Sequence, residues 1–241
     1  MVQRAVNAIA IAMFVQISSA YNFDISAPIP RTPTTKASSA ASQTRRSLFA
    51  ATAAGAWGLS AATARAEPAN TQTYSDPAYG ISFTVPASWT KVDSSLESGP
   101  GGGASRKLLL WVDPEDPDTN AFLAYTPVRG DYTALSSFGS IDSVAQTVVP
   151  NGPGIDSELV QSKTANQFYY FDYKVQPDPK DKMRRLKTVF AIAHSDSVST
   201  PPDMLVTFTS QTTQAKFDSD ASAAAVIGAS LDSFKISAPK K

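Results

Sequence analysis

YGISFTVPASW, residues 79–89, is the stretch at which the folded part of this chain begins. Ile81, Phe83 and Val85 alternate with small polar residues, which is the period-two pattern of a strand with one buried face. A glycine and a proline bracket this strand as breakers. Trp89 follows shortly after the proline and is placed to fold back over the apolar face. The stretch therefore predicts the first core strand of a domain, and the residues before it have the character of sorting signals.

The first 66 residues combine three targeting patterns. Residues 1–20 place an apolar run between one Arg and a group of small residues, as a secretory signal peptide does. Residues 21–44 are rich in Ser, Thr and Pro with a single acid, which is the composition of a transit peptide. Residues 45–66 place two arginines before a mild, Ala-rich run that ends on Ala-Arg-Ala, the twin-arginine pattern. The alternative is an uncleaved membrane anchor at 50–64, although alanine and glycine contribute little to membrane insertion.

The remaining residues, 67–241, are predicted to form one acidic domain without a transmembrane helix. The leader holds six of the 21 Lys and Arg but only one of the 21 Asp and Glu, so 15 basic and 20 acidic residues remain. An acidic domain makes nucleic acid an improbable partner, because binding to phosphates depends on basic side chains. The absence of cysteine excludes disulfides, thiolate catalysis and Cys-type metal sites, and a single histidine excludes multi-His metal centres.

Beyond residue 89 the pattern predicts an α+β fold. Apolar Ile141, Val144, Ala145 and Val148 recur at helical spacing between a capping serine and Pro150, so a helix is expected there. A terminal helix is expected to start near 218 or 219, with one apolar face. That face would hold Ala224, Ile227, Leu231 and Phe234. Strands are expected at 108–112, 121–128, 158–164, 168–175, 185–193 and 204–210, and a loose Gly-rich loop at 98–103. Hairpin connections predict a central antiparallel sheet flanked by helices.

Four landmarks in register resemble the PsbP family: GISFTVPASW at 80–89, FGS at 138–140, FYYFDY at 168–173 and ASLDSF at 229–234. The resemblance spans 74–236. It implies an α/β/α sandwich that is preceded by a disordered targeting leader and carries no catalysis of its own. Members of the family are lumenal proteins of the oxygen-evolving side of photosystem II, where they help retain calcium and chloride, or are relatives that assist photosystem assembly. The three nested signals likewise resemble targeting to the thylakoid lumen of plastids bounded by extra membranes.

Two departures from the family pattern favour a PsbP-like or PsbP-domain relative over the main subunit, and a third concerns the leader. Only about a dozen residues separate Ala66 from Tyr79, where the main subunit has a longer arm. The strand that begins Arg184-Arg185 lacks the His that some members place beside a Lys at this point and that is implicated in metal binding. The leader has Tyr21 where an aromatic residue, usually Phe, follows the first cleavage point.

The acidic turn between the strands at 108–112 and 121–128 is the candidate metal site. Its carboxylates stand at Asp113, Glu115, Asp116 and Asp118. Carboxylates at alternate positions supply the oxygen ligands that Ca²⁺ prefers. Two prolines stiffen the turn, and it lacks the glycine and the distal bidentate glutamate of an EF-hand loop. The alternative is therefore a solvated hairpin turn.

A basic run is the candidate surface for docking onto acidic lumenal subunits of photosystem II. It consists of Lys180, Lys182, Arg184, Arg185 and Lys187. Such a stripe would steer association in a salt-dependent way. In the strand at 185–193 the even-numbered residues are expected to share the buried face, so the basic side chains of 185 and 187 would point away from it. The alternative is a solvated strand edge kept polar to prevent edge-to-edge pairing.

The remaining candidates favour structure over chemistry. His194 stands beside Ser195 and Asp196, but adjacent residues do not make a catalytic triad, whose members converge from separate segments. A loop histidine able to titrate near neutral pH is expected instead. The tyrosines at 169, 170 and 173 indicate strand packing rather than a ligand-stacking surface. The sequence thus predicts a non-enzymatic lumenal protein that binds photosystem II, with a lumenal enzyme, or a ligand carrier with a cleft near the Gly-rich loop, as alternatives.

Overall fold

The computed structural model describes residues 70–96, 106–128, 132–195 and 203–237. The three leader segments and the Gly-rich loop predicted at 98–103 lie outside the described residues. Their boundaries therefore stay predictions.

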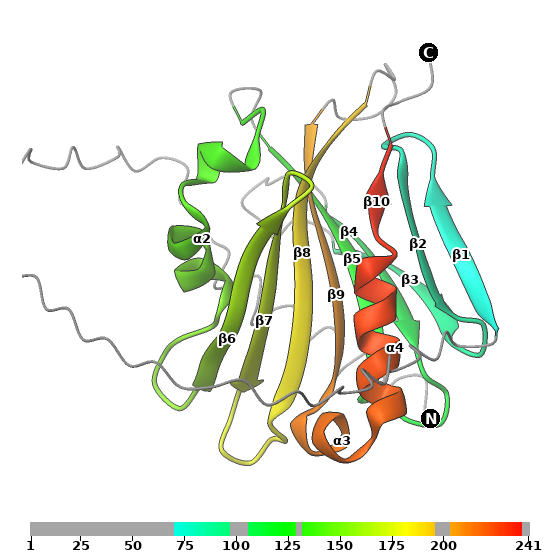
Figure 1. Ribbon diagram of the computed structural model, residues 1–241, viewed down its shortest axis with the longest axis vertical. Coiled ribbons are helices and arrows are strands. Elements are labelled where there is room, and N and C mark those ends of the chain that lie inside the picture. Colours follow the sequence, from blue (N-terminus) through cyan, green and yellow to red (C-terminus); the bar gives the residue numbers. More distant parts are fainter. Residues whose placement is uncertain (1–69, 97–105, 129–131, 196–202, 238–241) are drawn as a thin grey trace, which may run out of the picture. The chain divides into compact units, whose positions relative to one another are not determined.

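A seven-stranded antiparallel sheet is the centre of the domain (Figure 1). Its strands follow the order β3-β4-β5-β9-β8-β7-β6, and every neighbouring pair is antiparallel. Their bounds are β3 Thr90–Leu96, β4 Arg106–Val112, β5 Asn120–Pro127, β6 Asp156–Ala165, β7 Phe168–Gln176, β8 Arg184–His194 and β9 Asp203–Thr213. All six strands predicted beyond residue 89 are present, and the α+β prediction with a central antiparallel sheet is confirmed.

One face of this sheet packs against a smaller sheet and the C-terminal helix. The smaller sheet has the order β1-β2-β10, with β1 Thr71–Asp76, β2 Ile81–Pro86 and β10 Lys235–Ile236. Ile81, Phe83 and Val85 are at most 1% exposed, and Trp89 is buried in the same core cluster. The strand predicted from YGISFTVPASW and the inward position of its tryptophan are therefore confirmed.

The C-terminal helix lies over the same face (Figure 1). It is α4, Ala221–Asp232, and the shorter α3, Gln214–Ser219, precedes it. The predicted start near 218 was wrong, because Asp220 has an extended backbone that separates the two helices, and its carboxylate caps α4. Ile227 and Leu231 are buried as predicted, but Ala223 takes the buried position predicted for Ala224.

The opposite face of the sheet packs against α2, Ile141–Val148, and the short 3₁₀ helix η1, Leu135–Phe138 (Figure 1). The helix begins as predicted, with the Ser140 hydroxyl accepting a hydrogen bond from the Ser143 N–H at 3.2 Å. Val144, Ala145 and Val148 pack against aromatic and aliphatic side chains of β7 and β8. Helices on both faces give the predicted α/β/α arrangement.

The pattern missed β1, β3, α3 and β10. β1 and β3 carry few apolar residues, and β10 has only two residues, so periodicity alone does not mark them. In the described residues no helix is long and apolar enough to cross a membrane.

Candidate functional site

Hydrogen bonds within the acidic turn that joins β4 and β5 fix its conformation. The Asp113 carboxylate accepts a hydrogen bond from the Glu115 N–H at 3.0 Å, and the Asp116 carboxylate accepts one from the Asp118 N–H at 3.2 Å. The Thr119 N–H donates to the Asp116 carbonyl at 2.8 Å. These bonds make a compact hairpin turn, in line with one of the two interpretations of this segment.

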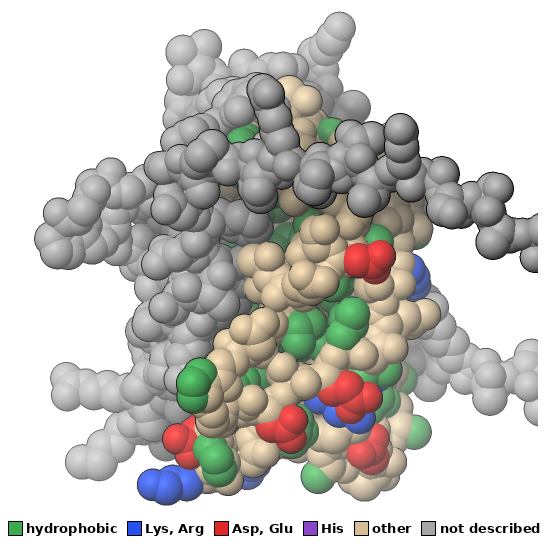
Figure 2. All heavy atoms as spheres, turned by 90° about the vertical axis from the view of Figure 1, so that its left-hand side faces the viewer, with side chains coloured by type: hydrophobic (Ala, Val, Ile, Leu, Met, Phe, Trp, Pro, Cys, Tyr) green, Lys and Arg blue, Asp and Glu red, His purple; other side chains and the backbone are tan. Residues whose placement is uncertain are grey.

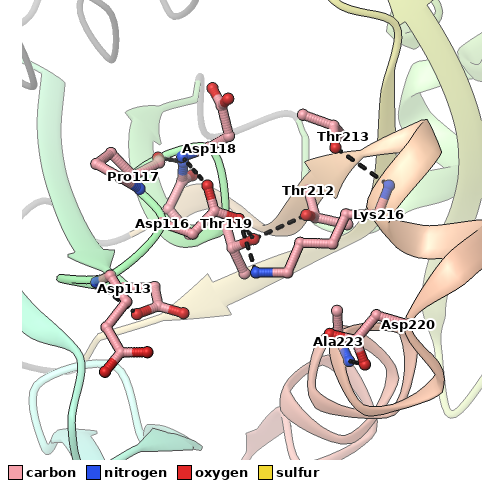
Figure 3. Close-up of polar contacts among 12 residues, drawn as sticks. Asp113, Asp116, Pro117, Asp118, Thr119, Thr212, Thr213, Lys216, Asp220 and Ala223 are labelled. Atoms are coloured by element: carbon pink, nitrogen blue, oxygen red, sulfur yellow. Dashed lines mark hydrogen bonds and ion pairs between the residues drawn. The ribbon is translucent and has the colours of Figure 1, made fainter.

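Asp116 points toward a lysine of α3 (Figure 3). Its Oδ2 lies 2.8 Å from the Lys216 Nζ and accepts a 2.6 Å hydrogen bond from the Thr119 hydroxyl. Thr119 in turn bonds to the Thr212 hydroxyl of β9 at 2.7 Å. Burial alone would raise the pKa of Asp116, but these hydrogen bonds and the ammonium outweigh it and lower the pKa. The same hydrogen bond raises the pKa of Lys216 against its desolvation, so the pair is ionised at neutral pH.

Asp118 faces the start of β8. Its two oxygens lie 2.7 Å from Nη2 of Arg184 and 2.8 Å from Nζ of Lys182. The Arg184 side chain is 10% exposed, whereas that of Lys182 is 69% exposed. Burial again favours the neutral acid, but the two cations lower the pKa of the Asp118 carboxyl below its ordinary value. The pair therefore ties the β4–β5 turn to β8.

Another carboxylate, that of Asp172 in β7, pairs with Arg185 and Lys187 of β8. Arg185 donates a hydrogen bond from Nη2 to Oδ2 of Asp172 at 2.9 Å. Its Nε lies 2.6 Å from Oδ1, an ion-pair contact that lacks the geometry of a second hydrogen bond. The Lys187 Nζ lies 3.7 Å from the same carboxylate. Both cations also lie over the ring of Phe217 in α3, at 5.1 and 5.6 Å from its centroid.

Arg185 and Lys187 point away from the face that holds Leu186, as predicted. The alternative of a solvated strand edge was wrong, because β8 is an inner strand and its second face is also covered. Arg184 and Arg185 are each 8% exposed. β8 lies between β7 and β9 and is covered on both faces, because α3 and α4 contact one face and η1 contacts the other. Arginine tolerates this burial because each guanidinium has a carboxylate partner.

Among the predicted site residues, Asp118 pairs with Lys182 and Arg184. The other ion pairs of this group use Lys216 and Asp172, which were not candidates. Of the five basic residues, Lys180 is the one whose side chain has no ion pair or hydrogen bond within the described ranges, and its residue is exposed. Across those ranges, no three His, Cys, Asp or Glu side chains converge in a way that could hold a metal ion. The geometry gives Asp116 and Asp118 a structural role, and metal binding at the turn stays a prediction.

His194 closes β8 and does not lie in a loop. Its Nδ1 lies 2.5 Å from the Asp203 carboxylate on the neighbouring strand, and its ring is half exposed. Ser195 is buried, and Asp196 lies outside the described residues. The partner acid therefore comes from β9, which the sequence did not indicate.

The strand tyrosines pack as predicted. Tyr173 is 1% exposed in the core on the α2 side, and burial raises its pKa to about 12 although the Thr188 hydroxyl offers a hydrogen bond that lowers it. Tyr170 is partly buried beside Phe168, and Tyr169 donates a 3.3 Å hydrogen bond to the Gly139 carbonyl. The three rings therefore pack within the sheet or contact the segments that flank it.

Sequence reasoning missed Asp172 and Lys216, which organise two of the three ion-pair groups. A lone aspartate inside the aromatic run FYYFDY was a usable signal, because a charge on a core strand needs a partner. Lys216 carried no such signal, since lysine in a polar helix turn is ordinarily solvated.

The described domain coincides with a known sequence family. A family model described as PsbP matches residues 69–236. The chain belongs to the PsbP family. Among curated proteins, this PsbP-family chain is 24% identical over 127 residues to PsbP domain-containing protein 3, chloroplastic, of Arabidopsis thaliana. That alignment covers 50% of this chain and 49% of the relative, so the chain spans about half the length of the curated relative that it matches.

A solved PsbP structure has the same fold. The solution structure of cyanobacterial PsbP (CyanoP) from Synechocystis sp. PCC 6803 has a TM-score of 0.50 and 19% identity, and the match covers 71% of this chain and 95% of that one. The Ran-binding protein Mog1p of Saccharomyces cerevisiae matches with a TM-score of 0.34 and 14% identity, over 69% of this chain and 95% of its own. At these identities the likeness of CyanoP concerns the fold alone.

Proposed function

We propose that this protein is a non-enzymatic PsbP-family protein of the plastid thylakoid lumen that associates with photosystem II. The observation that carries the proposal is the family match, which spans nearly the whole described domain. The chloroplastic relative supports a plastid location, and the nested leader at 1–66 supports the lumen of a plastid with extra membranes. Its role would be to support assembly or stability of the oxygen-evolving complex.

The charge arrangement narrows how such an association would work. Arg184, Arg185 and Lys187 are held by internal carboxylates, so they contribute little to a docking surface. Lys180 and Lys182 on the β7–β8 turn remain the accessible cations of the basic run. We place the salt-dependent contact with acidic lumenal subunits at this turn. Any retention of calcium or chloride would then be a property of the assembled complex.

Expression of the full-length, C-terminally tagged gene in a plastid-bearing host tests the proposal. Thylakoid membranes are washed at increasing salt, and the released and retained fractions are separated on native gels. The tagged protein should co-migrate with photosystem II at low salt and leave it as the salt concentration rises. A protein that stays in the free lumen fraction at every salt concentration, or a fluorescent fusion outside the plastid, would contradict the proposal.

A charge-reversed pair of variants tests the docking turn. Lys180→Glu should release the protein at lower salt than the wild type. Lys235→Glu makes the same charge change at an exposed residue of β10 and should leave release unchanged. Equal behaviour of the two variants would remove the turn from the interface while leaving the association itself standing.

A further inference from the structure

β6 is an outer strand of the seven-stranded sheet. It pairs with β7 on one side, and no other described strand pairs with its second side (Figure 1). An unpaired strand edge presents a row of backbone donors and acceptors to any strand that can approach it. β6 has 10 residues, and alternate residues direct their N–H and C=O groups to the open side, apart from the local irregularity described next.

Two neighbouring apolar residues stand at the middle of this edge. Leu159 is 40% exposed and Val160 is 42% exposed, and they are the exposed large hydrophobic residues of the part of the chain that the structure describes. The pairing register with β7 shifts between Leu159 and Gln161, so Val160 is the extra residue of a β-bulge. An apolar pair on an open edge is what natural edge strands ordinarily avoid, which indicates that this one is covered in the working state of the protein.

The charged residues of β6 are placed so that two copies of the strand, related by a two-fold axis, bring opposite charges together. Glu158 lies on one side of the apolar pair and Lys163 on the other. When two copies of an antiparallel-paired strand meet with the axis between Val160 and Gln161, Glu158 of each copy lies opposite Lys163 of the other. Figure 2 views the side of the molecule that carries α2 and β6, and it shows apolar side chains among acidic and basic ones there.

We propose that two copies of this chain associate through their β6 edges, in antiparallel orientation, with the Leu159–Val160 pairs in contact across the two-fold axis. An isologous interface of this kind buries the same patch on both copies, as closed dimers require. The bulge shortens the regular pairing, so backbone bonds and one small apolar patch supply the contact. A small interface of this type is reversible, and its dissociation constant is expected to be on the order of tens of micromolar.

Sedimentation velocity of the full chain from about 1 µM to about 200 µM, a range that brackets such a constant, tests the proposal. The wild type should pass from monomer to dimer. Val160→Lys should weaken dimerisation by about tenfold or more, because it buries a charge at the axis. Thr73→Lys, at an exposed residue of the open edge of β1, is the matched control and should dimerise like the wild type. Monomer throughout the range, or unchanged dimerisation of Val160→Lys, would overturn the proposal.

A charge swap supplies a second test that does not depend on the apolar pair. Glu158→Lys alone and Lys163→Glu alone should each weaken the dimer by a few fold, since each places like charges across the axis. The double variant restores opposite charges across the two-fold axis and should recover most of the wild-type association, although residue 158 then no longer pairs with Lys174 of its own chain. A double variant weaker than both single variants would contradict the antiparallel register. Thermal unfolding of each variant, compared with the wild type, shows that the variant folds.

Discussion

Asp118→Asn is the substitution that tests the ion pairs of the turn most directly. The asparagine keeps the shape of the side chain but removes the charge that faces Arg184 and Lys182. Removing one member of a fully buried ion pair costs about 3–5 kcal/mol, because the other charge is left uncompensated. Here the Arg184 side chain is 10% exposed but the Asp118 side chain is 21% exposed, and an amide oxygen still accepts a hydrogen bond. We therefore expect the free energy of unfolding to fall by about 2 kcal/mol.

Urea unfolding of the full chain, followed by the fluorescence of the buried Trp89 and Trp111, measures this loss. Lys182→Ala is the matched control, because it removes the solvent-exposed partner of the same carboxylate. Solvent screens a pair whose lysine is 69% exposed, so this variant should unfold nearly with the wild type. Equal losses in Asp118→Asn and Lys182→Ala would refute the assignment of the stabilisation to Arg184.

The same pair has a defined pH dependence. The folded-state pKa of Asp118 is lowered from an ordinary value of 3.8, so its contribution is fully present above about pH 4–5 and is lost as the pH falls through the folded pKa. The difference in unfolding free energy between the wild type and Asp118→Asn should thus be constant from pH 5 to pH 7 and shrink below about pH 4. A difference that persists undiminished at about pH 2 would contradict an electrostatic origin.

Three further outcomes follow from local geometry. Gly80→Ala should lower the free energy of unfolding in urea by about 2–4 kcal/mol, because Gly80 has φ +65° and an added Cβ would lie 2.1 Å from the Ser237 carbonyl oxygen. The control, Gly228→Ala, adds a methyl group to open space in α4 and should be neutral or stabilise by up to about 1 kcal/mol. Asp220→Ala should cost about 1 kcal/mol in the same assay, since its carboxylate caps the Ser222 and Ala223 N–H groups, and an unchanged midpoint would exclude a capping role. In an absorbance titration of tyrosine, Tyr173 should stay protonated past pH 10 until the domain unfolds, because burial raises its pKa to about 12, and Tyr173→Phe should leave the remaining titration unchanged.

The sheet strands with strong apolar patterns were predictable from sequence because their physics is local. Phe83 and its neighbours alternate at period two, and Ser140 and Pro150 mark the limits of α2 through capping and steric exclusion. The family resemblance added the order of layers, which the structure confirms. β1 was not predictable, since its six residues hold only Tyr74 as a large core contact and its strand conformation depends on pairing with β2.

The sequence by itself predicted that a basic segment with the pattern of a targeting leader precedes an acidic, cysteine-free α+β domain, because composition and periodicity are properties of the chain alone. It could not determine which charges are available to a partner. Only the tertiary structure decided that Asp116 and Asp118 face Lys216 and Arg184, which are distant in sequence and meet only when β4–β5, β8 and α3 assemble. The physical reason is that a buried charge is destabilising unless an opposite charge lies beside it, and the topology of the fold decides which residue lies there.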